Sequence, residues 1–387
     1  MHVVATSALP IDLAGLVTAA LPGTTVDVPA TGHVGIDRVD LSNADALVCL
    51  LLDRIDARVL ERAPKLKVVA NCAVGVDNLD LGALAARNVV AANTPDVLTE
   101  ATAELAFTLM LAAARRLGEG ERLVRAGQWN GWALDQLLGQ SLLGKTLGIV
   151  GFGRIGQAMA RRAYGFGMRV VYASASSDTS SSAASSSAAS SSAASSSGAS
   201  SSGASSSGAS SSGTSSSGTS SSGTSFGSSS SSPSSKASAS SASPGAFSLF
   251  DIRQVAERVE LDALFACADA ISLHCPLTPD TRNLVDARRL GLVKATAVLV
   301  NTARGGCVDE GALADALDRG QLFAAGLDVY AREPEIHPRL QASERVVLAP
   351  HIGSATTEAR TQMARLCADA VIAVLSGRRP PNLVERS

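Results

Sequence analysis

The stretch that decides the fold is Thr146-Leu-Gly-Ile-Val-Gly-Phe-Gly-Arg-Ile-Gly156. It begins with an apolar run of strand length, passes through three glycines spaced as GxGxxG, and continues into a helical pattern that reaches Tyr164. In this context the first glycine permits a tight turn, the second lets the backbone approach a pyrophosphate, and the third allows close packing of helix on strand. The helix N-terminus adds free N–H groups and a positive dipole. We therefore predict a dinucleotide site formed by Gly151, Phe152, Gly153, Arg154, Ile155 and Gly156.

Apolar runs of strand length alternate with helical patterns on both sides of this stretch. The expected strands are Val3–Ala5, Ala46–Leu52, Val68–Asn71, Val89–Ala92, Thr146–Gly151, Met168–Tyr172, Ala270–His274, Ala297–Asn301, Ala325–Val329 and Val346–Ala349. The expected helices include Ile11–Ala20, Asp56–Arg62, Leu79–Arg87, Thr99–Arg116, Leu261–Cys267, Gly311–Arg319 and Glu358–Leu375. Such alternation is typical of open parallel sheets covered by helices. The sequence therefore predicts an α/β protein with two doubly wound parallel-sheet domains.

A serine-rich tract interrupts the second half of this pattern. Of the 70 residues between Ser174 and Ser243, 42 are serine, and five-residue units of the forms AASSS, GASSS and GTSSS repeat from Ala183 to near Thr224. A period of five matches neither a helix face nor a strand face, and the residues offer almost nothing to bury. We expect residues 174–245 to be a disordered low-complexity insert, with a functional binding tract as the alternative. Asp251–Arg258 is then the candidate for the helix expected after the preceding strand.

The composition excludes several classes of protein. With 387 residues and a net charge of −2, the chain is long enough for two domain cores and has no general attraction for nucleic acid or anionic membrane. The longest uncharged apolar run, near Leu105–Ala114, is too short to cross a bilayer, and Met1-His2-Val3-Val4 begins like a strand rather than a secretion signal. The six cysteines are scattered, so we expect neither a disulfide framework nor a metal site. These features predict a cytoplasmic protein.

The residue that selects the cofactor normally lies about twenty positions beyond the first glycine, at the end of the next strand. An acid there binds the adenosine ribose of NAD, whereas an arginine pairs with the extra phosphate of NADP. This chain has Ala173 and Ser174 at that point. The absence of an acid removes repulsion of a phosphate, to which the Ser174 hydroxyl can donate. The sequence therefore favours NADP slightly and leaves NAD open.

Three later segments each place a polar side chain just beyond an expected strand: Arg304, Glu333 and His351. Each has an ordinary interpretation by itself, as a surface cation, a solvated acid and a turn histidine. The carboxyl ends of the strands in an open parallel sheet, however, form its ligand crevice. Their joint occurrence behind a dinucleotide loop therefore predicts that the three side chains converge on one substrate.

The chain resembles the D-isomer-specific 2-hydroxyacid dehydrogenases, and within them the glyoxylate/hydroxypyruvate reductases and related 2-ketogluconate reductases. The resemblance covers essentially the whole chain outside the serine-rich tract. It rests on the motifs Asn71-Cys-Ala-Val-Gly-Val-Asp-Asn78, Thr94-Pro-Asp-Val-Leu-Thr-Glu100, Gly148-Ile-Val-Gly-Phe-Gly-Arg-Ile-Gly156, Asn301-Thr-Ala-Arg-Gly305 and Pro350-His-Ile-Gly-Ser-Ala-Thr356. The spacings of Arg304, Glu333 and His351 also fit the family.

This resemblance implies a Rossmann coenzyme domain and a flavodoxin-like substrate domain. Residues 1–98 and 352–387 would form the substrate domain, and residues 99–351 the coenzyme domain. The implied reaction is NAD(P)H-dependent reduction of a small 2-oxo acid (glyoxylate, hydroxypyruvate or 2-ketogluconate) to the D-2-hydroxy acid. Relatives are usually homodimers, built through the coenzyme domain and the segment around Leu105–Trp132. Because the cofactor-selecting residue is missing, a catalytically impaired relative that acts as a dinucleotide-sensing binding protein is the alternative.

The resemblance also implies a role for each candidate residue. Arg304 would pair with the carboxylate and keto oxygen of the substrate, where a planar guanidinium group fits. His351 would donate the proton to the carbonyl oxygen, and Glu333 would orient the imidazole and favour its protonated form. The substrate carboxylate would also accept hydrogen bonds from the N–H groups of Val74 and Gly75. The remaining implied cofactor contacts are Thr302, Ala303 and Asp328.

Overall fold

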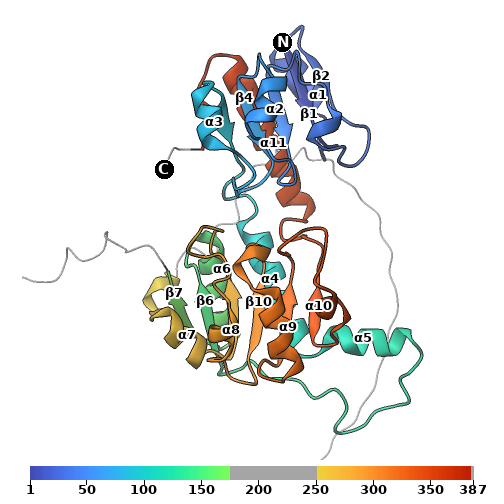
Figure 1. Cartoon of the computed structure of the whole chain (residues 1–387), viewed down its shortest axis with the longest axis vertical. Helices are drawn as coiled ribbons and strands as arrows, with labels where there is room; N and C mark the ends of the chain where they lie inside the picture. The colour runs from blue at the N-terminus through green and yellow to red at the C-terminus, as the bar shows by residue number, and fades with distance from the viewer. Residues whose placement is uncertain (175–250, 385–387) are drawn as a thin grey trace, which may run out of the picture. The chain divides into compact units, whose positions relative to one another are not determined.

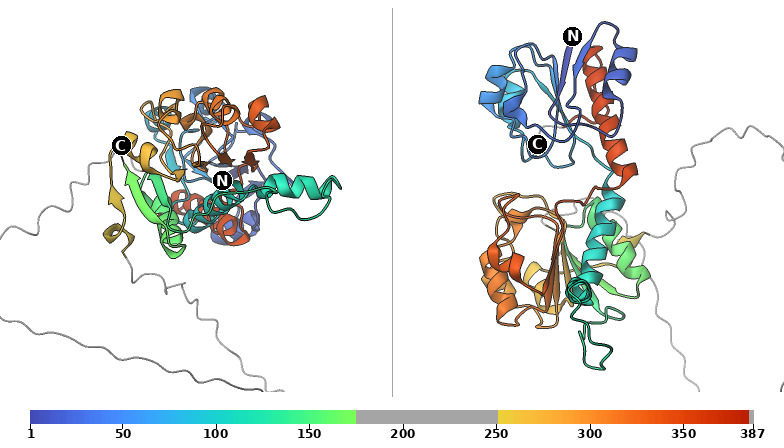
Figure 2. Two further views of the ribbon diagram at one scale, coloured as in Figure 1. Left: turned by 90° about the horizontal axis from the view of Figure 1, so that it is seen from below. Right: turned by 90° about the vertical axis from the view of Figure 1, so that its right-hand side faces the viewer.

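The computed structural model describes residues 1–174 and 251–384 and contains two parallel sheets with helices on both faces (Figures 1 and 2). The prediction of two parallel-sheet α/β domains is thus confirmed. The predicted serine-rich insert lies outside the described residues, apart from Ser174.

The first sheet has five parallel strands in the order β2-β1-β3-β4-β5. Its strands are β1 (His2–Ala5), β2 (Thr25–Asp27), β3 (Ala46–Cys49), β4 (Val68–Asn71) and β5 (Val90–Ala92). Alternate residues of a strand point to opposite faces. The residues facing one side pack with α2 (Ala57–Arg62) and α3 (Leu81–Ala86), and those facing the other with α1 (Leu13–Ala20) and α11 (Thr357–Leu375). This strand order is that of flavodoxin-like folds.

The second sheet has seven parallel strands in the order β12-β11-β10-β9-β6-β7-β8. Its strands are β6 (Thr146–Val150), β7 (Arg169–Ala173), β8 (Glu257–Arg258), β9 (Ala270–Leu273), β10 (Val298–Asn301), β11 (Ala324–Leu327) and β12 (Val346–Leu348). One face is covered by α4 (Thr99–Ala114) and α6 (Arg154–Gly165), and the other by α7 (Leu261–Cys267), α8 (Ala287–Leu290), α9 (Glu310–Asp318) and α10 (Pro338–Ala342). Strands β6 to β11 have the order of the Rossmann fold, and β12 is added at one edge of the sheet.

Capping residues fix where many of the helices begin. The side chain of an aspartate or threonine accepts a hydrogen bond from a backbone N–H in the first turn, which satisfies a donor that has no partner inside the helix. The residues that do this are Asp12, Asp56, Asp80, Asp286, Asp309 and Thr356. They lie immediately ahead of α1, α2, α3, α8, α9 and α11.

One sequence-based expectation is wrong: Asp251–Arg258 does not form a helix. Asp251 caps a single 3₁₀ turn, Ile252–Gln254, and the chain then extends into the two-residue strand β8. Ile252 is buried, whereas both residues of β8 are exposed, so the segment lacks the apolar stripe that would hold a helix on the sheet. The segment joins the edge of the second sheet instead, where β8 pairs with β7.

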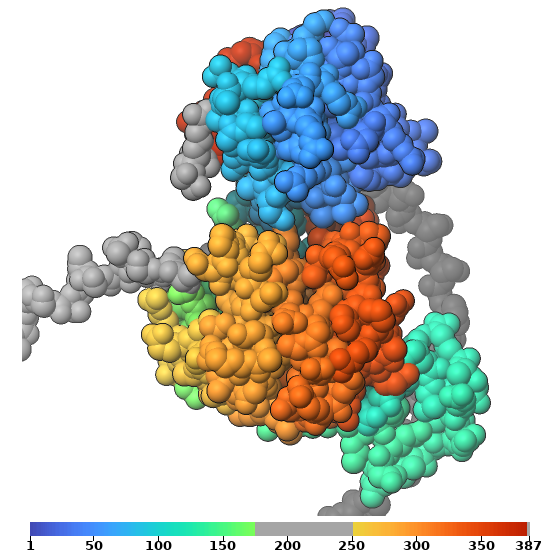
Figure 3. Space-filling model, viewed as in Figure 1, coloured from blue at the N-terminus to red at the C-terminus, as the bar shows by residue number. Residues whose placement is uncertain are grey.

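Besides β8 and the 3₁₀ turns, the elements that the sequence does not predict are β2, α8, α10 and α5 (Leu117–Arg125). Helix α5 has no buried residue. Figure 3 shows α5 and the segment after it, in teal, standing out from the surface. No helix among the described residues is both long and apolar enough to span a bilayer.

Candidate functional site

The glycines of the dinucleotide loop follow β6, as predicted, and each has a different environment. Gly151 has a φ of +93°, and a Cβ atom there would lie 2.7 Å from the backbone of His274 and Cys275. A Cβ on Gly156 would collide with the carbonyl oxygen of Gly151. A Cβ on Gly153 would meet no atom within 4 Å. Gly151 and Gly156 are therefore required by the fold itself, whereas the space beside Gly153 is open to a ligand.

The first turn of α6 supplies hydrogen-bond donors next to this open space. Gly153 is the N-cap of α6 and makes no side-chain capping bond. The N–H groups of Arg154, Ile155 and Gly156 belong to the first helical turn, where backbone donors have no partner within the helix. Such a turn binds the phosphates of a dinucleotide, so the residues present fit the predicted cofactor.

Two side chains of the loop are already held by the protein. The Arg154 guanidinium lies 2.6 Å from a carboxylate oxygen of Asp96. The Phe152 ring stacks on Tyr172, with ring centroids 4.0 Å apart and an interplanar angle of 13°. We therefore expect Phe152 and Arg154 to contact a cofactor through their backbone rather than their side chains.

The glycine environments predict opposite results for two similar substitutions. Gly153→Ala should leave the melting temperature unchanged and weaken dinucleotide binding about tenfold or more, because the new methyl group enters the space beside the helix N-terminus. Gly156→Ala should lower the melting temperature, because its methyl group collides with backbone. Thermal unfolding and a fluorescence titration with NADPH would measure both effects. Wild-type affinity in Gly153→Ala would contradict this interpretation of the loop.

A partly buried histidine, His274, follows β9 directly beside this loop. The His274 Nε2 atom lies 2.8 Å from the Ser272 hydroxyl, and burial lowers the pKa of His274 to about 4 from its ordinary 6.5. Since the unfolded chain takes up this proton more readily, the stabilisation is complete above about pH 6.5 and is lost as the pH falls towards 4. We expect the protonation of His274 to lower the free energy of unfolding by roughly 3 kcal/mol as the pH falls from 6.5 to 4. Denaturant unfolding at stepped pH should show a shallower acid dependence for His274→Asn; an identical dependence would contradict the prediction.

The loop after β10 carries Thr302, Ala303 and Arg304. The Asn301 side chain stabilises this loop, because it accepts a hydrogen bond from the Ala303 N–H at 3.0 Å and donates one to the Arg304 carbonyl at 2.9 Å. The Thr302 hydroxyl is buried and has no hydrogen-bond partner among the described residues. A buried hydroxyl without a partner is unfavourable. It is therefore a second feature that fits a bound cofactor.

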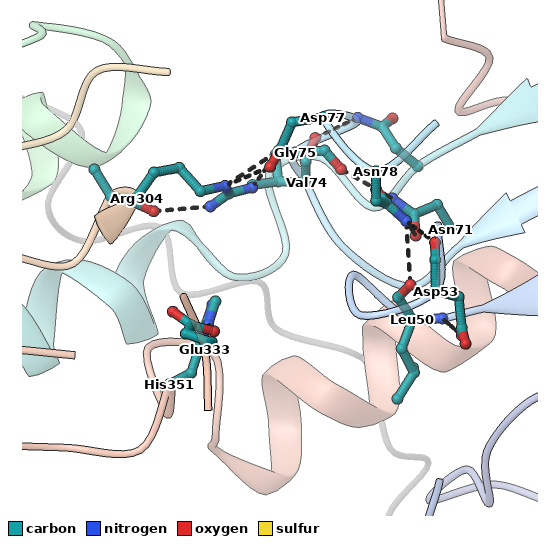
Figure 4. Close-up of polar contacts among 12 residues, drawn as sticks. Leu50, Asp53, Asn71, Val74, Gly75, Asp77, Asn78, Arg304, Glu333 and His351 are labelled. Carbon is teal, nitrogen blue, oxygen red and sulfur yellow. Dashed lines mark hydrogen bonds and ion pairs between the residues drawn. The ribbon is translucent and has the colours of Figure 1, made fainter. Parts of the chain in front are cut away.

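Arg304 contacts the loop after β4 (Figure 4). Its Nε and Nη2 atoms both lie about 3 Å from the carboxylate of Asp77, and its Nη1 donates to the Ala303 carbonyl at 2.8 Å. A Cβ on Gly75 would collide with the Arg304 guanidinium. Partial burial works against the charge of Asp77, but Arg304 outweighs it and holds the pKa of this carboxyl below its ordinary value. The predicted substrate residues Arg304 and Gly75 therefore lie in direct contact.

The loop from Asn71 to Asn78 is held through its carbonyl groups. Asn71 donates to the Gly75 carbonyl at 2.9 Å, and Asn93 donates to the Val74 carbonyl at 2.8 Å. Among residues 1–174 and 251–384, no acceptor receives the N–H of Val74 or of Gly75. This arrangement leaves two backbone donors beside a guanidinium group, which together suit a carboxylate.

Glu333 and His351 form a hydrogen-bonded pair. The Glu333 Oε2 atom lies 2.7 Å from His351 Nδ1, and Oε1 accepts from the Tyr330 N–H at 3.0 Å. Because an ionised carboxylate can only accept, Nδ1 carries a proton and Nε2 remains for chemistry. Burial opposes the charge of Glu333, but the hydrogen bonds from His351 and Tyr330 outweigh it and lower the pKa of its carboxyl. Figure 4 shows this pair in the same region as Arg304.

Asp328 holds the segment that carries His351. Its two carboxylate oxygens accept from the N–H groups of Ile352 and Gly353 at 2.7 and 2.8 Å, and its carbonyl accepts from the His351 N–H at 2.9 Å. Burial raises the pKa of Asp328. His351 itself has a φ of +55°, a region that favours glycine. These three hydrogen bonds keep His351 in that conformation. They also mean that both carboxylate oxygens of Asp328 have partners within the protein.

Several residues near these side chains were not predicted individually. Asp77, Asn71 and Asn78 lie in the motif that carries the family resemblance, but the sequence does not show that Asp77 binds Arg304.

Within the described ranges, no group of three or more His, Cys, Asp and Glu side chains is placed to hold a metal ion. All six cysteines are free of disulfide bonds.

Comparison with known proteins places the chain in a family. The family model described as "D-isomer specific 2-hydroxyacid dehydrogenase, NAD binding domain" matches residues 107–197 and 243–353. A glyoxylate reductase from Thermococcus litoralis is 40% identical over 346 residues, which is 88% of this chain and 84% of the relative. A glyoxylate reductase from Pyrococcus furiosus is 39% identical over 350 residues, 89% of this chain and 84% of the relative.

Solved structures agree with the sequence relatives. The crystal structure of a Thermus thermophilus protein superposes with a TM-score of 0.75 at 36% identity and covers 100% of both chains. An NADPH-dependent glyoxylate/hydroxypyruvate reductase from Sinorhizobium meliloti, in complex with NADP and malonate, has a TM-score of 0.69 at 25% identity and covers 100% of this chain and 99% of that one.

The fold, the dinucleotide loop and these relatives together define an NAD(P)-dependent oxidoreductase that acts on CH–OH groups. The chain belongs to the D-isomer-specific 2-hydroxyacid dehydrogenase family and lies in its glyoxylate reductase branch.

Proposed function

We propose that the protein reduces glyoxylate, hydroxypyruvate or 2-ketogluconate to the corresponding D-2-hydroxy acid. The observation that carries this proposal is the contact of Arg304 with the loop at Gly75, in the same region as the Glu333–His351 pair. A 2-oxo acid needs a cation and N–H donors for its carboxylate and an acid for its carbonyl oxygen. The relatives named glyoxylate reductase support this choice of substrate.

In this proposal Arg304 and the loop at Val74 and Gly75 bind and orient the substrate. The guanidinium group presents parallel N–H donors that match a carboxylate and its neighbouring keto oxygen. The N–H groups of Val74 and Gly75, which have no acceptor among the described residues, would complete the carboxylate site. Asp77 now receives the Nε and Nη2 donors of Arg304 and would keep the guanidinium oriented between turnovers.

His351 would transfer the proton. Glu333 fixes the imidazole through Nδ1, so Nε2 is the atom that would donate to the carbonyl oxygen during reduction and recover the proton in the reverse direction. The bound nicotinamide supplies the hydride. The overall change consumes one proton and one reduced cofactor for each 2-oxo acid converted to a 2-hydroxy acid.

The cofactor would lie along the carboxyl ends of β6 and β7. Gly151, Phe152, Gly153, Arg154, Ile155 and Gly156 would bind the pyrophosphate, and Ser174 the adenosine ribose. Thr302, Ala303 and Asp328 would lie near the nicotinamide; the buried Thr302 hydroxyl without a partner supports this placement. We propose a slight preference for NADPH over NADH, because neither Ala173 nor Ser174 brings a carboxylate to the ribose site.

A cofactor and substrate panel tests the proposal. Purified protein is titrated with NADPH and with NADH, and cofactor oxidation is then followed after addition of glyoxylate, hydroxypyruvate or 2-ketogluconate. We expect at least one of the three 2-oxo acids to cause oxidation of NADPH or NADH. The 2-hydroxy acid formed should have the D configuration. Dinucleotide binding without oxidation of either cofactor would contradict the proposal and favour the alternative of a dinucleotide-sensing binding protein.

We also propose that the protein is a cytoplasmic homodimer whose interface includes α5 and the segment after it. Large apolar side chains of this segment are exposed, including Trp132 at 81% and Leu134 at 82%. Contiguous exposed apolar surface commonly marks a protein interface. Six cysteines without a disulfide bond suit a reducing compartment. Sedimentation of the purified protein would measure its mass in solution, and a monomer would contradict the dimer.

We also propose that residues 1–98 with 352–387 form the substrate domain and that residues 99–351 form the coenzyme domain.

A further inference from the structure

The edge of the second sheet brings a cation to the point where a cofactor-selecting residue would lie. The parallel strands β7 and β8 pair Tyr172 with Arg258. The Arg258 Nη2 atom lies 3.5 Å from the carbonyl oxygen of Ser174, although the two residues are 84 positions apart in the chain. The guanidinium group therefore reaches the carboxyl end of β7.

This end of β7 adjoins the dinucleotide loop. Val150 pairs with Ala173 in the parallel register of β6 and β7, and the Gly151 N–H donates to the Ala173 carbonyl at 2.8 Å. When a pyrophosphate lies on such a loop, the adenosine ribose lies at the carboxyl end of the second strand. Arg258 thus borders the place where the ribose of a bound dinucleotide would lie.

The charge of Arg258 is available to a ligand. The neighbouring acid, Glu257, forms its ion pair with Arg169, at the opposite end of β7. In the part of the chain that the structure describes, Arg258 has no ion pair, and its side chain is exposed. A guanidinium group carries five N–H donors in a planar fork and is weakly hydrated, which suits it to phosphate.

We propose that Arg258 binds the 2′-phosphate of NADPH and is the residue of this chain that favours NADPH over NADH. This inference rests on the dinucleotide site of the proposed function. In an NADP site the cation is usually expected at the end of the second strand, which is β7 here. In this chain Arg258 would supply it from the third strand, β8. The Ser174 carbonyl positions the guanidinium group, and neither Ala173 nor Ser174 brings a carboxylate that would repel the phosphate.

The test compares Arg258→Ala with the wild type by calorimetric titration with 2′,5′-ADP and with 5′-AMP. These ligands differ only in the 2′-phosphate and require no turnover. We expect the Kd of 2′,5′-ADP to rise about tenfold to a hundredfold, and that of 5′-AMP to change by less than about twofold. The KM of NADPH should rise in the same proportion, with little change for NADH. The matched control is Arg58→Ala on α2, whose side chain is 91% exposed.

Two results with the Arg258→Ala variant would each overturn the assignment of Arg258. One is an unchanged preference for 2′,5′-ADP in Arg258→Ala, and the other is an equal loss of affinity for both nucleotides. A wild-type protein that binds the two nucleotides equally would also overturn it. Failure of the proposed function has a different signature, because a protein that oxidises neither cofactor with any 2-oxo acid still reports its nucleotide preference in this titration.

Discussion

Replacing His351 by alanine is expected to lower kcat for 2-oxo acid reduction by roughly 10²–10⁴-fold, the usual contribution of a positioned general acid. Alanine cannot carry the proton that Nε2 would donate, and the Nδ1 bond to Glu333 is lost with it. Binding of NADPH should change by less than about twofold, because the dinucleotide loop at Gly151–Gly156 is formed by other elements. Steady-state kinetics and an NADPH titration on the same preparation would measure both quantities. Near-normal turnover would refute the assignment of His351.

Glu333→Gln separates positioning from proton donation. The glutamine keeps the shape of the side chain but removes the negative charge that faces Nδ1. We expect a smaller loss of kcat than in His351→Ala, because the imidazole remains but loses the charged acceptor that fixes Nδ1. The KM for the 2-oxo acid should change by less than about twofold, since Arg304 and the loop at Gly75 are untouched. An equal loss of kcat in Glu333→Gln and His351→Ala would contradict a positioning role for Glu333.

Replacing Arg304 by lysine should lower kcat/KM for the 2-oxo acid by roughly 10²–10³-fold. Lysine keeps the positive charge but loses the planar fork, and with it the paired donors that now contact Asp77. The loss should exceed that of the charge-conserving control Arg319→Lys, whose side chain is 61% exposed. NADPH affinity should remain within about twofold of wild type.

The alternative result for Arg304 is equally clear. If kcat/KM for glyoxylate and for hydroxypyruvate both stay within about threefold of wild type in Arg304→Lys, a fork of paired donors is not needed. The substrate carboxylate would then depend chiefly on the N–H groups of Val74 and Gly75, and the proposed role of Arg304 would be wrong.

Most of the fold could be predicted because buried parallel strands are continuous apolar runs. The run at Val68–Asn71 is fully buried and coincides with β4. Strand β2 escaped prediction because Thr25–Asp27 is a short edge strand with only one partly buried residue. Helix α5 escaped because none of its residues packs on the core.

The positions of the site residues could be predicted, but not all of their partners. Arg304, Glu333 and His351 each follow a strand, and topology brings the ends of parallel strands to one edge of a sheet. The partner of Arg304, Asp77, is 227 residues away in the chain, and that of Ser174, Arg258, comes after the serine-rich tract. Motif spacing does not encode such contacts, because they depend on how separate loops meet in the folded chain.

The two-residue pairing of β8 with β7 has a consequence for protein engineering. Because β8 pairs with β7, the chain leaves and rejoins the same edge of the sheet. We therefore expect residues 175–250 to be replaceable by a foreign domain whose termini lie close together. Since Ser174 and Arg258 would border the adenosine end of the cofactor, a ligand that tightens the inserted domain would alter NADPH affinity. The chain then becomes a scaffold for a sensor whose output is the rate of cofactor oxidation.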